Sequence, residues 1–196
     1  MSVPKTMFQL SGRGYAAANL SHATLVIIDA QKEYLSGPLA LSGMDAAVAN
    51  IRQLLAAARA AGRPVVHVRH LGTVGGLFDP QGERGEFIPG LEPQGDETII
   101  GKLLPSAFHG TELEKRLQDL GSLDLIVAGF MSHSSVSTTV RRAKDYGYRC
   151  TLVEDASATR DLAFKDGVIP AAQIHQCEMA VMADNFACVA PTASLI

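Results

Sequence analysis

The chain has 196 residues, of which 47% are hydrophobic and 19% charged, and its formal net charge is −3. This composition is ordinary for a globular protein, and the lack of a basic block argues against a nucleic-acid partner. No apolar run approaches the roughly 20 residues of a membrane span, so we expect no membrane contact. The length predicts a single domain over residues 1–196, large enough to bury a core without disulfides.

The first 21 residues lack the continuous apolar core of a signal peptide. We expect them to form an arm that packs on the body of the domain or on a neighbouring subunit. Cys150, Cys177 and Cys188 are an odd, scattered set without a CxxC pair, and each lies in an apolar stretch. They are predicted to be buried free thiols, which indicates a reducing, cytoplasmic compartment.

Apolar runs alternate with helical patterns along the rest of the chain. The run ATLVIIDA at residues 23–30 is apolar at successive positions, as in a strand buried on both faces. Residues 42–45 resemble a capping box ahead of a helix that Gly62 ends. Further strands are predicted at residues 64–70, 97–102, 123–130, 148–155 and 185–190, and further helices at 111–120, 135–146 and 170–184. The alternation predicts an α/β fold of three α/β/α layers around a mainly parallel open sheet.

The carboxyl ends of the predicted strands carry the candidate chemistry. In an open parallel sheet, ligands bind outside these ends. Asp29 follows the first strand, Lys102 ends the third, and the turn GFMSHSS (residues 129–135) follows the fourth. A carboxylate, an ammonium and a turn at a helix start supply an acid/base group, a charge partner and an oxyanion hole. The glycine-rich residues 72–90 are too long for a simple connection and are predicted to border the site.

Plainer interpretations of these residues stay open at this point. The plainer interpretation of Asp29 is a strand-end turn cap, that of Lys102 a solvated lysine, and that of Ser135 the N-cap hydroxyl of the next helix. His133 is too close to Ser135 in sequence to act readily as its base. His67 and His70 lack a third ligand of convincing spacing, which argues against a metal. The GxGxxG and GxxxxGK[ST] patterns are absent, which excludes dinucleotide and P-loop sites.

The motifs taken together resemble the isochorismatase-like superfamily of cysteine hydrolases. They are VIIDAQKEY, IIGKLLPSAFHGTELEKRL, LIVAGFMSHSSVSTTVRRAKDYGY and TLVEDAS, spread over most of the chain from Thr24 to Val189. The resemblance implies a catalytic triad in which Asp29 and Lys102 match the family's aspartate and lysine. It also implies a cis peptide bond between Phe130 and Met131, with the N–H groups of Met131 and Ser135 forming an oxyanion hole.

Ser135 departs from the family pattern, because it occupies the position of the catalytic cysteine. A thiol at a helix start beside a lysine is partly ionised at neutral pH, whereas a serine hydroxyl stays protonated. Three interpretations remain open. The serine replaces a natural cysteine and inactivates an amidohydrolase that works through a thioester; the enzyme is of the isochorismatase type, in which Asp29 protonates a vinyl ether without a nucleophile; or the protein is a non-catalytic relative that only binds.

The resemblance also bears on cofactors, pocket and assembly. Nicotinamidases of the superfamily carry a D-x-H cluster after the second strand, and this chain has none there, so a metal-free amidase without cofactors is implied. We expect a small-molecule substrate, and pocket walls built from loops after strand ends: Tyr34, Leu35, Phe78, Phe108 and His133. The arm and the glycine-rich loop favour a homo-oligomer, with Phe78 or Phe87 offered to the neighbouring subunit.

Overall fold

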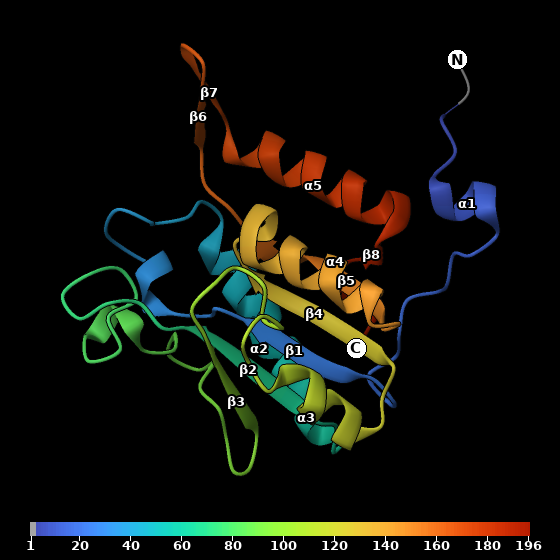
Figure 1. The fold of residues 1–196 in the computed structure, drawn as a ribbon, viewed down its shortest axis with the longest axis horizontal. Helices are drawn as coiled ribbons and strands as arrows, with labels where there is room; N and C mark the ends of the chain where they lie inside the picture. The colour runs from blue at the N-terminus through green and yellow to red at the C-terminus, as the bar shows by residue number, and fades with distance from the viewer. Residues whose placement is uncertain (1–2) are drawn as a thin grey trace.

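A six-stranded parallel sheet forms the centre of the computed structural model, which describes residues 3–196. The strand order is β3-β2-β1-β4-β5-β8 (Figure 1). The strands are β1 (Thr24–Ile28), β2 (Val65–His70), β3 (Thr98–Lys102), β4 (Asp124–Phe130), β5 (Arg149–Ala158) and β8 (Ala187–Ala190). The prediction of a mainly parallel open sheet is confirmed. The order reverses between β1 and β4, so the crevice between their carboxyl ends is the expected ligand site.

Helices cover both faces of the sheet. They are α2 (Met44–Ala60), α3 (Leu113–Leu120), α4 (Ser137–Asp145) and α5 (Ala171–Asn185). Residues of α2 share one buried cluster with Leu25 and Ile27, while α3, α4 and α5 share the other with Val26 and Ile28. Successive residues of β1 thus face opposite layers, which explains why its sequence is apolar without alternation. The three-layer α/β/α prediction is confirmed.

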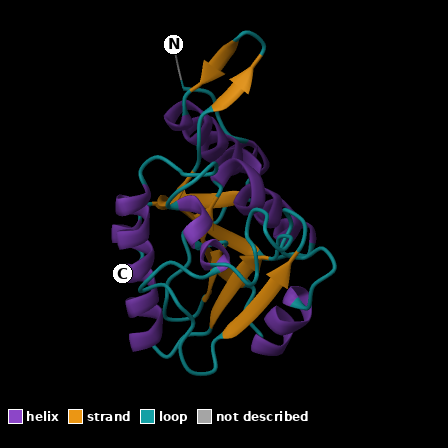
Figure 2. Cartoon of the chain, turned by 90° about the vertical axis from the view of Figure 1, so that its left-hand side faces the viewer, coloured by secondary structure: helices purple, strands orange, loops and turns teal. Residues whose placement is uncertain are grey.

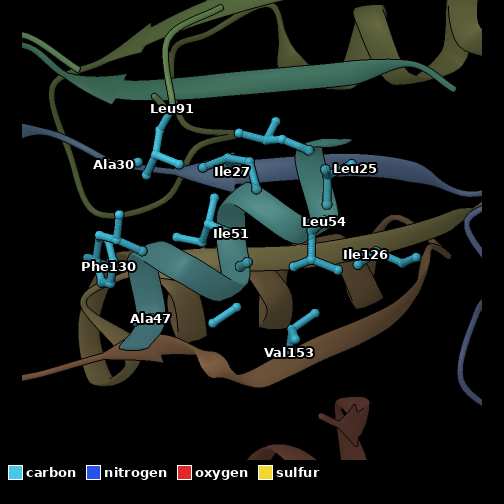
Figure 3. Packing of buried hydrophobic residues seen from close by; sticks show 14 of the residues in the cluster. Leu25, Ile27, Ala30, Ala47, Ile51, Leu54, Leu91, Ile126, Phe130 and Val153 are labelled. Atoms are coloured by element: carbon cyan, nitrogen blue, oxygen red, sulfur yellow. The ribbon is translucent and has the colours of Figure 1, made fainter. Parts of the chain in front are cut away.

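The core beneath α2 shows how this layer is held. Ile51 and Leu54 project from α2 among Leu25, Ile27 and Ile126 of the central strands (Figure 3). None of these side chains is more than 1% exposed. Burying one such aliphatic side chain stabilises the fold by roughly 1.5–3 kcal/mol, so the spacing of apolar residues in α2 is sufficient to fix this helix against β1 and β4.

The chain between β5 and α5 forms a hairpin that the sequence did not predict. Its strands are β6 (Leu162–Phe164) and β7 (Gly167–Ile169), and they pair only with each other. The hairpin projects from the body of the molecule (Figure 2). Phe164 and Val168 are 61% and 65% exposed on it. Strand β5 also runs three residues beyond its predicted end at Asp155.

Short helical turns complete the connections. They are the 3₁₀ turns Lys32–Tyr34, Glu83–Gly85 and Thr192–Ser194, the π-helical turn Ser132–Val136 and the helix α1 (Met7–Ser11). The predicted capping box of α2 is wrong, because the N-cap is Gly43 and no side chain bonds the first turn. A capping box exists instead at α1, where Thr6 and Gln9 bond each other's backbone N–H groups.

The N-terminal arm packs on the body of its own chain; residues 1–2 of the predicted arm lie outside the described residues. The Tyr15 hydroxyl bonds the backbone N–H and C=O of Cys150, and Met7 N–H donates to Asp184. Only part of the thiol prediction is correct: Cys150 is buried, whereas Cys177 is exposed and Cys188 partly exposed, because their helix and strand positions face outward. Within residues 3–196, no helix has the length and apolarity needed to cross a membrane.

Candidate active site

Asp29 directly follows β1 at the point where the strand order reverses. Its side chain is 1% exposed, and its φ of +50° is a strained value for a residue with a side chain. The backbone is fixed from both sides, because Asp29 N–H donates to Val68 O at 2.8 Å and Gln31 N–H donates to Asp29 O at 2.8 Å. Backbone hydrogen bonds to β2 and to Gln31 therefore fix the position of Asp29 at the end of β1. The interpretation of Asp29 as a strand-end turn cap does not account for the burial of its side chain.

Lys102 ends β3 and reaches the same point across β2. Its Nζ lies 2.7 Å from Asp29 Oδ2, and both side chains are buried. Burial raises the pKa of the Asp29 carboxyl, and the ammonium of Lys102 and the hydroxyl of Ser135 only partly offset this effect. The Lys102 ammonium makes its ion-pair contact with Oδ2, whereas Oδ1 accepts no hydrogen bond from residues 3–196. Asp29 is thus a buried carboxyl with one unpartnered oxygen and an increased tendency to hold a proton.

Ser135 completes the predicted trio from the other side of the crevice. It lies inside the π-helical turn Ser132–Val136, between β4 and α4, and is 7% exposed. Its Oγ is 3.0 Å from Lys102 Nζ. The alternative that Ser135 caps a helix is wrong, since Met131 is the N-cap of this turn and Ser135 points to the lysine instead. The structure therefore brings Asp29, Lys102 and Ser135 together.

The backbone of the turn is set by a close contact between β4 and β1. The bond between Phe130 and Met131 is cis, as the family resemblance implies. Gly129 has φ +122°, and a Cβ atom built on it would lie 2.0 Å from Ile28 O. Only glycine fits this approach, which places Met131 and Ser135 beside the end of β1 and thus beside Asp29.

The predicted pocket walls are only partly assembled around this trio. Tyr34 and Phe78 are buried and stack edge to face at 5.2 Å, whereas Leu35 is exposed. His133 bonds Thr159 at the end of β5, and no contact with Ser135 is formed.

Phe108 stacks near Tyr146 at the end of α4 and Tyr148 before β5, at centroid distances of 5.2 and 6.1 Å. Both partners stand at the end of the sheet opposite Asp29, because they precede β5 while the site follows β1 and β4. The structure therefore does not bring Phe108 to the trio. Its loop after β3 folds back over α4, where its apolar ring is buried in the second core cluster.

Two fully buried polar residues beside the trio are given no role by the sequence analysis, and a third, His70, is considered there only as a possible metal ligand. Gln31 and Glu33 alternate with Asp29 after β1, and both are fully buried. Gln31 bonds the backbone of His70, and Glu33 accepts from Phe78 N–H and Arg84. His70 Nδ1 lies 3.4 Å from Lys102 Nζ. The sequence signal for Gln31 and Glu33 is the alternation D-x-Q-x-E directly after an apolar strand. Polar residues at buried positions need hydrogen-bond partners, so this pattern indicates a polar network at the strand end.

Residues 3–196 contain no group of three or more His, Cys, Asp or Glu side chains arranged to hold a metal ion. His67, one of the two histidines considered in the sequence, is fully buried and bonds Glu97 at 2.9 Å. His70 instead faces Lys102, so the two histidines of β2 have different partners.

Comparisons with known proteins identify relatives of this arrangement. Residues 23–194 match the family model described as the Isochorismatase domain. A crystal structure of an isochorismatase from Pseudomonas putida KT2440 is 79% identical, covers 99% of this chain and 100% of its own, and superposes with a TM-score of 0.98. A cysteine hydrolase from Pseudomonas syringae pv. phaseolicola 1448A is 27% identical, with 99% and 96% coverage and a TM-score of 0.85. Streptothricin hydrolase from Streptomyces noursei is 34% identical over 80% of this chain and 64% of its own length.

Proposed function

The chain belongs to the isochorismatase family of hydrolases, and we propose that its site is built to cleave the C–N bond of a small amide through an acyl-enzyme intermediate at position 135. The observation that carries this proposal is the convergence of three groups in one buried centre. Position 135 contacts the Lys102 ammonium at 3.0 Å, and that ammonium contacts Asp29 at 2.7 Å. A nucleophile position, a cation and a proton acceptor are thus in reach of one another.

With a cysteine at position 135, the reaction has two steps. Asp29 takes the thiol proton, the thiolate attacks the amide carbon, and the N–H groups of Met131 and residue 135 bind the oxyanion. Asp29 then gives the proton to the leaving amine as the C–N bond breaks and a thioester forms. Water hydrolyses the thioester, with Asp29 accepting its proton and returning it to the sulfur. Lys102 holds Asp29 in place and stabilises the thiolate throughout.

Serine at position 135 changes the expected rate of this chemistry. The hydroxyl remains protonated at neutral pH, and a carboxylate is a poor base for an alcohol even when burial raises its pKa, as it does for Asp29. The site is otherwise whole, with Lys102 and Asp29 paired. We therefore expect the chain with Ser135 to be inactive on amides, and its function as an amidohydrolase to depend on a cysteine there.

One observation favours a second candidate, a vinyl-ether hydrolase of the isochorismatase type. The raised pKa of Asp29 and its oxygen Oδ1, which accepts no hydrogen bond from residues 3–196, suit a group that must deliver a proton. In this reaction Asp29 protonates the vinyl carbon, and water adds to the oxocarbenium ion while returning a proton to Asp29. The hemiketal that results then breaks its C–O bond, and its hydroxyl proton passes to the leaving oxygen, which gives a ketone and an alcohol. No nucleophile at position 135 is needed, so Ser135 is compatible with activity. The relative from Pseudomonas putida is described as an isochorismatase.

Three proteins distinguish these functions: the chain with Ser135, Ser135→Cys and Asp29→Asn. Each is assayed on a panel of amides and ureas for ammonia or amine release, and on isochorismate for product release. Amide hydrolysis by Ser135→Cys alone, with a thioester detected by mass spectrometry, supports the amidohydrolase. Isochorismate hydrolysis with Ser135 present and lost in Asp29→Asn supports the second candidate. A protein that binds but turns over no substrate in any form is the non-catalytic relative, and this outcome contradicts both.

A further inference from the structure

The end of β2 places a histidine against the lysine of the site. His70 Nδ1 lies 3.4 Å from Lys102 Nζ, which also contacts Asp29 Oδ2 at 2.7 Å and Ser135 Oγ at 3.0 Å. An ammonium has three N–H donors and no acceptor. Because the ammonium can only donate, Nδ1 of His70 must be the acceptor in its contact with Lys102. The single ring proton of a neutral His70 then lies on Nε2.

The surroundings of His70 keep the ring uncharged. Partial burial and the ammonium of Lys102 both lower the pKa of His70, to about 4. At neutral pH the imidazole therefore carries one proton, which agrees with the acceptor role of Nδ1. A charged ring would place a fourth N–H donor against the ammonium and repel it.

The orientation of the ring is held by groups on neighbouring segments. The side-chain amide of Gln31 accepts from His70 N–H at 2.7 Å and donates to His70 O at 3.0 Å, and a further bond ties it to Gly85 O. The ring also packs edge to face on Phe78 at 5.0 Å. The side-chain amide of Gln31, which is fully buried, thus fixes the backbone of His70, and the contact with Phe78 restrains the direction of the imidazole.

The second ring nitrogen stays available. His70 is only half-buried, and its Nε2 contacts no hydrogen-bond partner in residues 3–196. Because Nε2 is not fully enclosed by protein atoms, it remains partly accessible from outside. His67, three residues earlier in β2, is different: its Nε2 is bonded to Glu97 and its ring is fully buried. An oriented N–H donor on a neutral ring, beside the reacting groups, is the feature that a substrate oxygen can use.

We propose that His70 is a substrate-binding and positioning residue, whose Nε2–H donates to an oxygen acceptor of the substrate while its Nδ1 orients the ammonium of Lys102. The assignment rests on the proposed hydrolase function. It gives the site a requirement beyond the scissile bond, because the substrate must carry a carbonyl, carboxylate or hydroxyl oxygen near that bond. A buried donor left unpaired by a substrate without such an oxygen disfavours binding.

Imidazole ¹⁵N NMR tests the assignment without any activity. At pH 7 we expect the His70 signals of a neutral ring with Nε2–H and acceptor Nδ1, and a titration midpoint near 4. Acetamide, added as the probe, should shift the His70 Nε2 signal and leave that of His67 unchanged. An Nδ1–H tautomer or a charged ring at pH 7 overturns the proposal, and so does a His70 signal that acetamide does not move.

Kinetics separate binding from a purely structural role. The background for this test is whichever is more active, the chain with Ser135 or Ser135→Cys. In it, His70→Leu should lower kcat/KM by about tenfold or more, mainly through KM, because one directed hydrogen bond to the substrate is lost. His70→Gln should retain most activity, because an amide offers both an acceptor for Lys102 and a donor for substrate. Equal loss in both variants overturns the proposal. If no protein turns over any substrate but the NMR expectations are met, the proposed function fails and the assignment of His70 as an oriented donor stands.

Discussion

Lys102 and Asp29 form an ion pair that is removed from water on all sides, with 2.7 Å between Nζ and Oδ2 and at most 1% exposure of either residue. Taking two charges out of water costs several kcal/mol per ion, and their attraction offsets this only in good geometry. The pair comes from β1 and β3, which are not neighbours in the sheet. Its net contribution to stability is therefore small.

This pair predicts a non-additive response to mutation. Lys102→Met leaves the Asp29 carboxylate buried without a partner, and Asp29→Asn does the same to the ammonium. Each single change should lower the free energy of unfolding by about 3–5 kcal/mol, measured by urea denaturation. The double variant should be more stable than the sum of the two losses implies, because no charge is left unpaired. Additive losses would show that the two residues are not coupled.

Gly129 predicts a steric failure at the turn. Gly129→Ala places a methyl group 2.0 Å from Ile28 O, against backbone that has no room to move. We expect a loss of about 3 kcal/mol or more in the free energy of unfolding. Gly121→Ala is the matched control: it has φ +68° but no atom within 4 Å of the added carbon, so only backbone strain of about 1 kcal/mol applies. Equal losses in the two variants are incompatible with the close contact.

Glu97 predicts acid sensitivity of the fold. Burial raises the pKa of its carboxyl, but hydrogen bonds from Arg59, Gln94 N–H and His67 outweigh this and hold it at about 2, below the ordinary 4.5. A depressed pKa stabilises the fold above pH 4.5, and this contribution is lost as the pH falls from 4.5 to 2. It amounts to about 3 kcal/mol.

Urea denaturation across this pH range measures the contribution. Glu97→Gln should be less stable than the parent at pH 7, and the difference should shrink toward pH 2. Glu112→Gln is the control, since Glu112 pairs with Arg116 on the surface at 3.8 Å and both side chains are exposed. A pH dependence that Glu97→Gln leaves unchanged would contradict the prediction.

The sheet was predictable because it follows from local pattern. Each buried parallel strand is an apolar run between helical periodicities, so the position of Asp29 after β1 and Lys102 at the end of β3 followed directly. The sequence could not give the π-helical turn around Ser135, because its bonds depend on Met131 O and on the contact of Gly129 with β1. The helix start was therefore predicted two residues before α4 begins.

The errors share one cause, which is that side-chain environments depend on distant segments. Phe108 was predicted as a pocket wall from its place after a strand, but the loop folds back toward Tyr146. His70 was considered only as a metal ligand, because its contact with Lys102 requires β2 and β3 to pair in a particular register, His70 opposite Lys102. The hairpin of β6 and β7 was missed because three-residue strands carry little periodicity.

Homo-oligomer formation remains a prediction, and we now expect its contact at the hairpin. Phe78 is buried in its own chain and Phe87 packs on His67 and Arg69, whereas Phe164 and Val168 are exposed. Light scattering at micromolar concentration should give a mass above that of one chain, and Phe164→Glu should reduce it. Leu123→Glu is the control, because Leu123 is equally exposed, at 61%, before β4 and away from the hairpin. A parent of monomer mass contradicts the prediction.

Tyr15 predicts that the N-terminal arm stabilises the fold of its own chain, in addition to any role in assembly. Its hydroxyl accepts from Cys150 N–H at 3.1 Å and faces the carbonyls of Cys150 and Phe186 at 3.3 Å, so the arm closes over the start of β5. Tyr15→Phe removes these bonds and leaves the ring in place. We expect the free energy of unfolding to fall by about 1–2 kcal/mol, with the same mass by light scattering. Tyr146→Phe is the control, because its hydroxyl meets only the exposed Arg142. If Tyr15→Phe changed the mass and not the stability, the arm would instead serve contacts between subunits.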